Sequence, residues 1–115
     1  MLDPKFYLLL DKLTEIFDYI SRESLEIILY RLDGIMYHRS IDNLLVRALI
    51  AGMPYSEEIW DVPAEVVYNP EIDAKYYAIL RRIVKVCDKF KEEKIDFTKT
   101  AIYLNCAKAR TPRLW

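Results

Sequence analysis

Four basic side chains occur close together in the second half of the chain. They are Arg81, Arg82, Lys85 and Lys89. Residues four apart project from the same side of an α-helix, so Arg81, Lys85 and Lys89 would share one face, with Arg82 beside them. Cations gathered on one helix face can neutralise the phosphates of a nucleic acid. The spacing therefore indicates a cationic ridge that binds a polyanion.

A second group of basic residues lies in residues 97–115, which we call the tail. Residues 97–115 contain four bases and no acid, together with Tyr103 and Trp115. Cations that contact phosphates, interleaved with rings that stack on bases, suit single-stranded nucleic acid. The connection near Asp96 is short, so a last helix would fold back along the preceding one and join both groups in one surface. The predicted nucleic-acid-binding residues are Arg81, Arg82, Lys85, Lys108, Arg110, Arg113, Tyr103 and Trp115.

Both basic groups also fit an ordinary protein surface. The ridge could be a solvated helix face whose cations pair with Asp88 and Glu92, and the tail could be a solvated basic end. The ridge taken alone favours this simpler interpretation. The presence of two basic groups close together in the sequence weakens this interpretation.

The tail also has the layout of a two-helix DNA-binding motif. Residues 98–104 would form a short first helix, Asn105 and Cys106 the turn, and the following residues a reading helix. In this layout the tail resembles a helix-turn-helix, which implies that the basic residues after the turn project toward phosphates. The sequence departs from that pattern, because Asn105 stands where glycine is usual and Pro112 falls inside the reading helix. The alternative is one C-terminal helix followed by a basic end.

A third signal is an arginine followed, after six residues, by a histidine. Arg31 and His38 have this spacing. It resembles the motif of HEPN-type ribonucleases, which implies that the two side chains meet on RNA across two protomers, as general base and charge stabiliser without a metal. Gly34 interrupts the helix that the motif would need, and the alternative places His38 and Arg39 in an exposed turn. This interpretation ranks third.

Length and composition predict a single helical domain over residues 1–115. The chain is 53% hydrophobic and 30% charged, and it contains two glycines. So few glycines argue against an all-β chain with many tight turns. The aliphatic content argues against a disordered chain.

Cysteine and histidine usage predicts no metal or cofactor. Cys87, Cys106 and the one histidine form neither a disulfide framework nor a recognisable zinc site. Cys87 would be a small buried apolar residue. No charged-then-apolar leader and no apolar run long enough to span a bilayer is evident. The expected location is the cytoplasm, without membrane contact.

The acidic residues are as unevenly distributed as the basic ones. The net charge is −1, yet residues 54–74 contain six acids and no base. Such an acidic stretch, together with a surface rich in the nine tyrosines of the chain, could form a protein interface. This favours a second function class, a protein–protein adaptor or a homodimerising domain.

The remaining chain is organised around a long helix predicted over residues 69–96. Asn69 would cap it, and Pro70 would take the first helical position. No glycine or proline follows, which allows about six turns. Its predicted apolar face comprises Ile72, Tyr76, Ile79, Leu80, Ile83, Cys87 and Phe90.

Four further helices are predicted from apolar spacing, caps and stops. The first covers residues 4–20, and the second begins at Ser21 or Ser24 and either ends at Gly34 or continues to residue 36. The third begins after residue 40 or 42 and stops at Gly52. The last is capped by Asp96 or Thr98, and its apolar positions include residues 101 and 104.

The stretch between the third helix and the long helix is the hardest to interpret. Residues 63–68 would form a helical turn or, alternatively, residues 65–68 a strand, within an acidic segment that crosses the bundle. The predicted fold is all-α: a compact bundle of about five helices with that short acidic crossing segment. The core should include Leu13, Ile28, Leu45, Leu80 and Ile83.

These observations predict a non-catalytic nucleic-acid-binding helical module. It would be a small regulator, or an accessory bundle that holds DNA for a replication enzyme such as a primase. The expected partner is DNA, single strands included, with a protein partner at residues 54–74 as a second contact. The adaptor or homodimer is the alternative.

Overall fold

The computed structural model describes residues 4–34, 40–53 and 62–108. Within these ranges every regular element is helical, which confirms the predicted all-α fold. The elements are α1 (Pro4–Ile16), α2 (Arg22–Gly34), α3 (Ser40–Ile50), α4 (Ala64–Val67), α5 (Pro70–Phe90), the 3-10 helix η2 (Lys91–Glu93) and α6 (Ala101–Lys108). The Cα radius of gyration of 13.7 Å matches the ~13 Å of a compact domain of about 100 residues. Among the helices described, none combines the length and the apolar character needed to cross a membrane.

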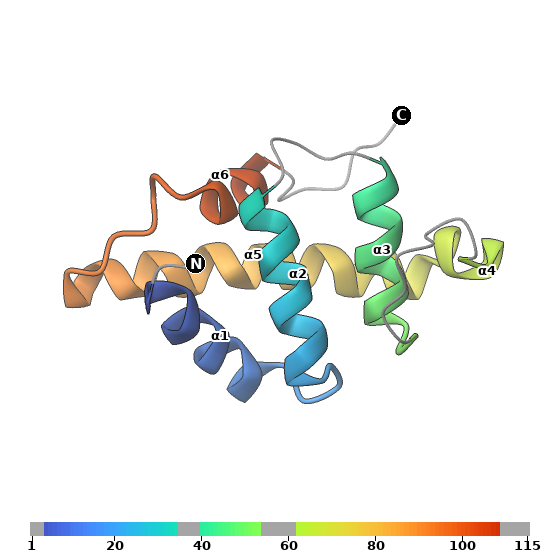
Figure 1. Ribbon diagram of the computed structural model, residues 1–115, viewed down its shortest axis with the longest axis horizontal. Helices are drawn as coiled ribbons and strands as arrows, with labels where there is room; N and C mark the ends of the chain where they lie inside the picture. The colour runs from blue at the N-terminus through green and yellow to red at the C-terminus, as the bar shows by residue number, and fades with distance from the viewer. Residues whose placement is uncertain (1–3, 35–39, 54–61, 109–115) are drawn as a thin grey trace.

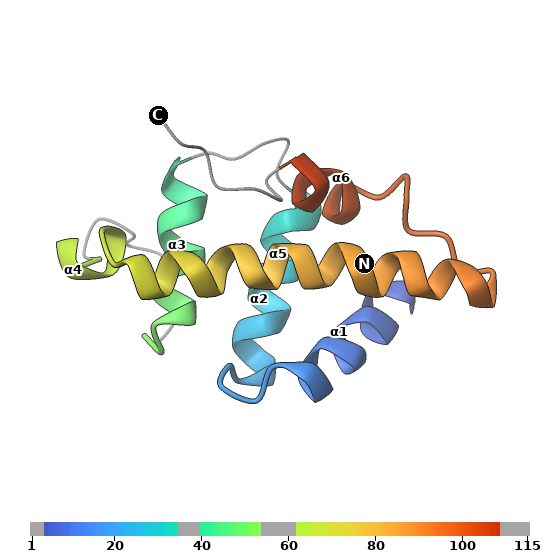
Figure 2. The ribbon, with the colours of Figure 1, turned by 180° about the vertical axis from the view of Figure 1, so that it is seen from behind.

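The long helix α5 is the axis of the fold (Figure 1). α2 and α3 cross it steeply on the same side, which is evident when the view is turned to place α5 in front (Figure 2). In both views α1 lies below α5 and α6 lies above it. Contacts join α5 to α1, α3 and α6, and join α2 to its neighbours α1, α3 and α6. The helices therefore pack across one another around a shared core.

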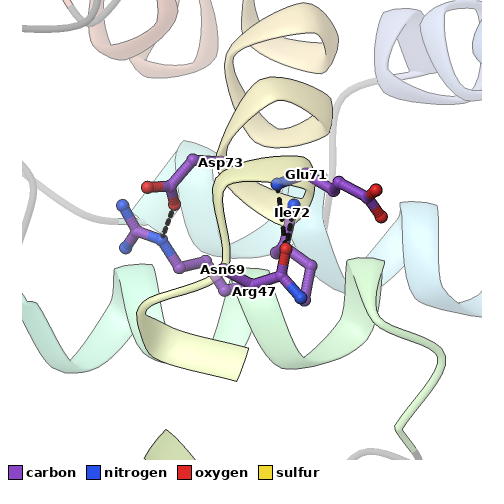
Figure 3. Close-up of polar contacts among 5 residues, drawn as sticks. All are labelled: Arg47, Asn69, Glu71, Ile72 and Asp73. Atoms are coloured by element: carbon purple, nitrogen blue, oxygen red, sulfur yellow. Dashed lines mark hydrogen bonds and ion pairs between the residues drawn. The ribbon is translucent and has the colours of Figure 1, made fainter. Parts of the chain in front are cut away.

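The start of α5 follows the predicted cap. The side-chain oxygen of Asn69 accepts the backbone N–H groups of Glu71 at 2.9 Å and of the next residue at 3.4 Å (Figure 3). Pro70 lies in the first turn, where its missing N–H costs no hydrogen bond. Beside this cap, Nε of Arg47 in α3 donates to Oδ1 of Asp73 at 2.7 Å. The first turn of α5 is thus both capped and tied to α3.

The end of α5 differs from the prediction. The helix stops at Phe90 and η2 follows it, so the predicted helical run to residue 96 is wrong. Lys94 adopts a left-handed backbone with φ of 64°. The N–H of Lys94 donates to the carbonyl of Lys91 at 3.0 Å, and the N–H of Ile95 donates to the carbonyl of Phe90 at 3.1 Å. These two hydrogen bonds close the end of the helix. Glycine usually occupies the left-handed position in such an ending, so a lysine at this position did not indicate that the helix stops.

Replacing Lys94 by glycine should stabilise the fold. A residue with a Cβ is disfavoured in the left-handed region, and glycine is not. We expect Lys94→Gly to raise the free energy of unfolding, measured by urea titration, by about 0.5–1 kcal/mol. The control is Lys91→Gly, at a right-handed residue with φ of −61°, which should lose about 1 kcal/mol. A loss of stability in both variants would contradict the prediction.

α1 ends four residues before its predicted end. Residues 17–21 turn the chain, and the Ser21 hydroxyl accepts the N–H of Ser24 at 3.1 Å at the start of α2. Ser21 is therefore the cap, one of the two predicted candidates. Phe17 and Ile20 are buried even though they lie outside a helix. The apolar pattern predicted too long a helix, because a turn can bury the same side chains.

The predicted stop of α3 at Gly52 is confirmed. Gly52 has φ of 87°, in the left-handed region that glycine tolerates. Its N–H donates to the carbonyl of Leu49 at 3.1 Å, and the N–H of Met53 donates to the carbonyl of Ala48 at 3.0 Å. These two bonds close the C-terminal end of α3 in the same way as the end of the long helix.

The stretch before α5 contains the short helix α4, which begins after Pro63. The helical turn predicted over residues 63–68 is confirmed, and the alternative strand is wrong. α4 packs against α3 beside the N-terminal end of α5 (Figure 1). Residues 54–61, the first part of the predicted crossing segment, lie outside the described residues, as does any continuation of α2 beyond Gly34.

The core prediction is confirmed at every residue tested. Leu13, Ile28, Leu45, Leu80 and Ile83 are each no more than 3% exposed. They come from α1, α2, α3 and α5, so one apolar core joins the four helices.

Two long-range hydrogen bonds hold the first and the last helix of the described chain. Nζ of Lys5 in α1 donates to the carbonyl of Asp96 at 3.1 Å and lies 5.5 Å from the ring centre of Phe97. On the other side, Nδ2 of Asn105 in α6 donates to the carbonyl of Leu32 in α2 at 2.7 Å. One bond thus holds α1 to the connection before α6, and the other holds α6 to α2.

Candidate nucleic-acid interface

A cleft of about 220 Å³ opens between α1 and α5. We call it the α1–α5 cleft. Four of its lining side chains are cationic, one is anionic and three are apolar. They are Lys12, Arg82, Lys85, Lys89, Glu93, Ile16, Val86 and Phe90. The lining thus combines an excess of positive charge with an apolar surface.

The register of α5 explains why cations and apolar groups meet there. Ile83, Val86 and Phe90 point into the core, and all three are buried. Arg82 and Lys89 directly precede residues of that buried face, so the helical turn of about 100° per residue places them on its flank. Phe90 and Val86 then form the floor of the cleft, and the basic side chains form its rim.

α1 supplies the opposite wall. Lys12 and Ile16 are four residues apart, so they project from the same side of α1 toward α5. Nζ of Lys12 lies 3.9 Å from a carboxylate oxygen of Glu15, and both side chains are at least half exposed. Such a pair contributes little and is screened by salt. An incoming anion can therefore compete for Lys12.

Two of the sequence-predicted residues, Arg82 and Lys85, line this cleft. Arg81 is exposed on the outer face of α5 and is not part of the lining. Lys89, which belonged to the ridge, does line it. Lys12 and Ile16 were missed. Their spacing on α1 gave no sign of a site, since only the packing of α1 on α5 brings them to the basic ridge.

Tyr103 lies on the other flank of α5. Its hydroxyl donates to Oδ1 of Asp88 at 3.0 Å, on the side where α6 packs. α1 and α6 lie on opposite sides of α5 in both ribbon views (Figures 1 and 2). The structure therefore brings Arg82 and Lys85 together with Lys12 and places Tyr103 away from them.

The predicted packing of the last helix against α5 is confirmed. α6 packs against α5 and α2, and it ends at the exposed residue Lys108. Arg110, Arg113 and Trp115 lie outside the described residues.

The resemblance to a helix-turn-helix does not hold. Asn105 and Cys106, the predicted turn, lie inside the continuous helix α6. Cys106 is fully buried, and the Asn105 side chain is bonded to α2. The residues that were expected to form the turn instead fix α6 to the core.

The cap of α6 also differs from the prediction. The hydroxyl of Thr100 accepts the N–H of Tyr103 at 3.2 Å, so Thr100 is the cap, not Asp96 or Thr98. Asp96 instead accepts the N–H of Thr98 at 2.9 Å and its hydroxyl at 2.7 Å. These hydrogen bonds hold the pKa of the Asp96 carboxyl below its usual value.

The apolar side of α6 was assigned to the wrong residue. Leu104 was expected to pack inward, and it is 50% exposed. The buried residues of α6 are Ile102 and Cys106, four apart. In a short helix with apolar residues on several sides, the sequence alone does not show which side is buried. The neighbouring helices decide it.

Two free thiols, Cys87 and Cys106, are buried at the junction of α5 and α6. Burial raises the pKa of Cys87 to about 12, and it raises the pKa of Cys106 as well. Both thiols therefore stay protonated near neutral pH, which makes them poor nucleophiles. The prediction that Cys87 is a buried apolar residue is confirmed.

The arginine–histidine motif is only partly described. Arg31 lies in the last turn of α2 and is half-buried. His38 and Arg39 lie outside the described residues. The ribonuclease interpretation therefore stays a prediction.

A second hollow, of about 470 Å³, lies between the α1–α2 turn and α3. Its described lining includes Tyr19, Ser21, Glu23 and Ile27, and no cationic side chain. Its described lining therefore lacks the positive charge that would attract phosphate. The two hollows differ in chemistry, and the α1–α5 cleft is the one that suits an anion.

Searches of the chain against protein-family models, curated proteins and solved structures found no match. Within residues 4–34, 40–53 and 62–108, no three His, Cys, Asp or Glu side chains come close enough to hold a metal ion.

Proposed function

We propose that this chain is a non-catalytic nucleic-acid-binding module. The observation that carries the proposal is the α1–α5 cleft, where Arg82, Lys85 and Lys89 face Lys12 of another helix. Cations from two helices converge there, which an ordinary solvated helix face does not require. Arg81, on the outer face of α5, extends the positive surface beyond the cleft.

Distance along α5 separates the positive surface from the acids at the start of that helix, although Glu93 lines the cleft and Glu15 pairs with Lys12. Glu71 precedes Arg82 by eleven residues on one straight helix, which corresponds to about 16 Å at 1.5 Å per residue. Salt at physiological concentration screens exposed charges beyond about 8 Å. Asp73 is in addition neutralised by Arg47 at 2.7 Å. A strand bound at the cleft would therefore experience little repulsion from the acids at the start of α5.

Salt dependence provides the direct test. We expect fluorescence anisotropy with a labelled oligonucleotide to show an affinity that falls steeply as salt rises. The double variant Arg82→Ala/Lys85→Ala should bind more weakly, with a log–log salt slope smaller by about 1.4–1.8, which corresponds to two lost phosphate contacts. The control variant is Lys91→Ala/Lys99→Ala, which removes equal charge from exposed residues outside the cleft.

The control should leave the slope nearly unchanged. If both double variants lose affinity equally, binding depends on total charge and not on the cleft. Absence of binding by the parent at low salt would refute the proposal. A third variant, Arg110→Ala/Arg113→Ala, tests whether the tail contributes phosphate contacts, as the sequence predicts.

The second candidate is the protein–protein adaptor or homodimer. One observation favours it: Tyr68, in the described part of the acidic segment, is 81% exposed. A large exposed aromatic beside Glu65 and Glu71 suits an interface with a basic partner. An adaptor would show no salt-dependent binding of oligonucleotides, so the same titration separates the two functions.

A further inference from the structure

We infer that the α1–α5 cleft receives one unpaired base of a single strand, so that the module prefers single-stranded to duplex nucleic acid. This inference rests on the proposed function and specifies its ligand. It follows from the size of the cleft, its apolar floor and the arrangement of the cations around it.

The size of the cleft suits one ring system. Its volume is about 220 Å³, below the ~300–1,000 Å³ of pockets that enclose drug-sized ligands. A base in a duplex is stacked and paired, and it reaches such a cleft only if it is extruded at an energetic cost. A base in a single strand avoids the unpairing part of that cost. The cleft should therefore discriminate between the two forms.

The lining suits a base with its phosphates. Ile16, Val86 and Phe90 offer an apolar floor to a ring, which phosphate alone does not need. The rim cations Arg82 and Lys89 are seven residues apart, or about 10 Å along α5. Phosphates on one strand of B-form DNA rise by about 3.4 Å each, so this rim covers more than one phosphate.

Glu93 marks the end of the cationic rim. It lies one turn beyond Lys89 and is the acidic side chain in the lining. A phosphate beside it would be repelled, whereas the amino group of a base could donate a hydrogen bond to its carboxylate. The charge pattern therefore places the phosphates along the rim from Arg82 to Lys89.

The test compares one sequence as a labelled single strand and as a duplex, titrated with the full chain at the same low salt. We expect the single strand to bind about tenfold more tightly or better, in line with the contribution of a base held on an apolar surface. Ile16→Phe fills the cleft and keeps every charge. We expect this variant to bind single strand and duplex with similar affinity, and to keep the parental salt slope.

The matched control is Ile27→Phe, the same substitution in the second hollow. It should keep the preference for single strands. Circular dichroism and thermal melting establish that both variants fold. A readout that needs no variant is 2-aminopurine in the strand, whose fluorescence should rise when the base leaves its stacked neighbours.

The outcomes separate this inference from the proposed function. Equal affinity of the parent for single strand and duplex, or no 2-aminopurine response, overturns the single-base cleft and leaves nucleic-acid binding in place. No binding of either form overturns both. Polyglutamate that displaces the strand as efficiently as unlabelled oligonucleotide would instead define a site for an acidic peptide, and would also overturn the inference.

Discussion

Replacing Leu80 by alanine should lower the free energy of unfolding by about 2–5 kcal/mol. Leu80 is 1% exposed and lies in the middle of α5, the helix around which the others pack. The substitution removes buried methyl groups and leaves a cavity that crossing helices cannot fully close. Urea titration at neutral pH gives the value directly. For a chain of this size the loss would be a large part of the total stability.

Leu104→Ala is the matched control, because it removes the same groups from a side chain that is 50% exposed. It should change the free energy of unfolding by no more than about 0.5 kcal/mol. A loss of less than half a kcal/mol for Leu80→Ala as well would show that α5 is not central to the fold.

The second large effect should appear at alkaline pH. Burial raises the pKa of Cys87 to about 12, and the pKa of Cys106 is also raised. In the unfolded chain both thiols ionise at about pH 8.5–9. Above that pH the unfolded state loses protons that the folded state keeps, so stability is fully present below about pH 9 and falls as the pH rises toward 12. By pH 11 Cys87 alone should cost roughly 2–3 kcal/mol, and Cys106 should add to that loss.

Tyr76 should add to this loss at higher pH, because burial raises its pKa to about 12. The measurement is the free energy of unfolding at intervals from pH 7 to pH 11. In the double variant Cys87→Ala/Cys106→Ala the baseline stability will be lower, and the decline above pH 9 should be distinctly shallower. A decline of the same steepness in parent and variant would mean that the thiols are not the cause.

Local signals in the sequence predicted the parts of the fold that local chemistry decides. Asn69 and Pro70 located the start of α5, and Gly52 located the end of α3. They did so because a helix cap and a left-handed backbone position each favour particular residue types. The apolar spacing of α5 identified its buried face. Those elements follow from interactions within a few residues.

The errors occurred where tertiary contacts override local preference. Lys94 closes the end of the long helix in a conformation that lysine does not favour, so no residue type announced it. Phe17 and Ile20 are buried from a turn, and the apolar pattern extended α1 through them. Leu104 faces outward because the positions of α5 and α2 decide which side of α6 is covered.

Only part of the candidate site could be predicted from the sequence, for the same reason. Arg82 and Lys85 belong to one helix, and their spacing was sufficient to identify them. Lys12 lies seventy residues earlier in the chain than Arg82, and only the packed fold brings it to the cleft. Tyr103 was grouped with the basic residues because α6 returns along α5, but the flank on which it returns depends on packing.

The two hydrogen bonds that hold α1 and α6 have a consequence for how the chain reaches its native state. Lys5 is bonded to a carbonyl 91 residues later in the sequence, and Asn105 to a carbonyl 73 residues earlier. Contacts between residues so distant in sequence slow the folding of a helical protein relative to a bundle of local hairpins. During synthesis, α1 and α2 would be complete long before their partners leave the ribosome. The parts of their apolar faces that α5 and α6 cover would stay exposed until those helices have been made, and a chaperone could bind them in that interval.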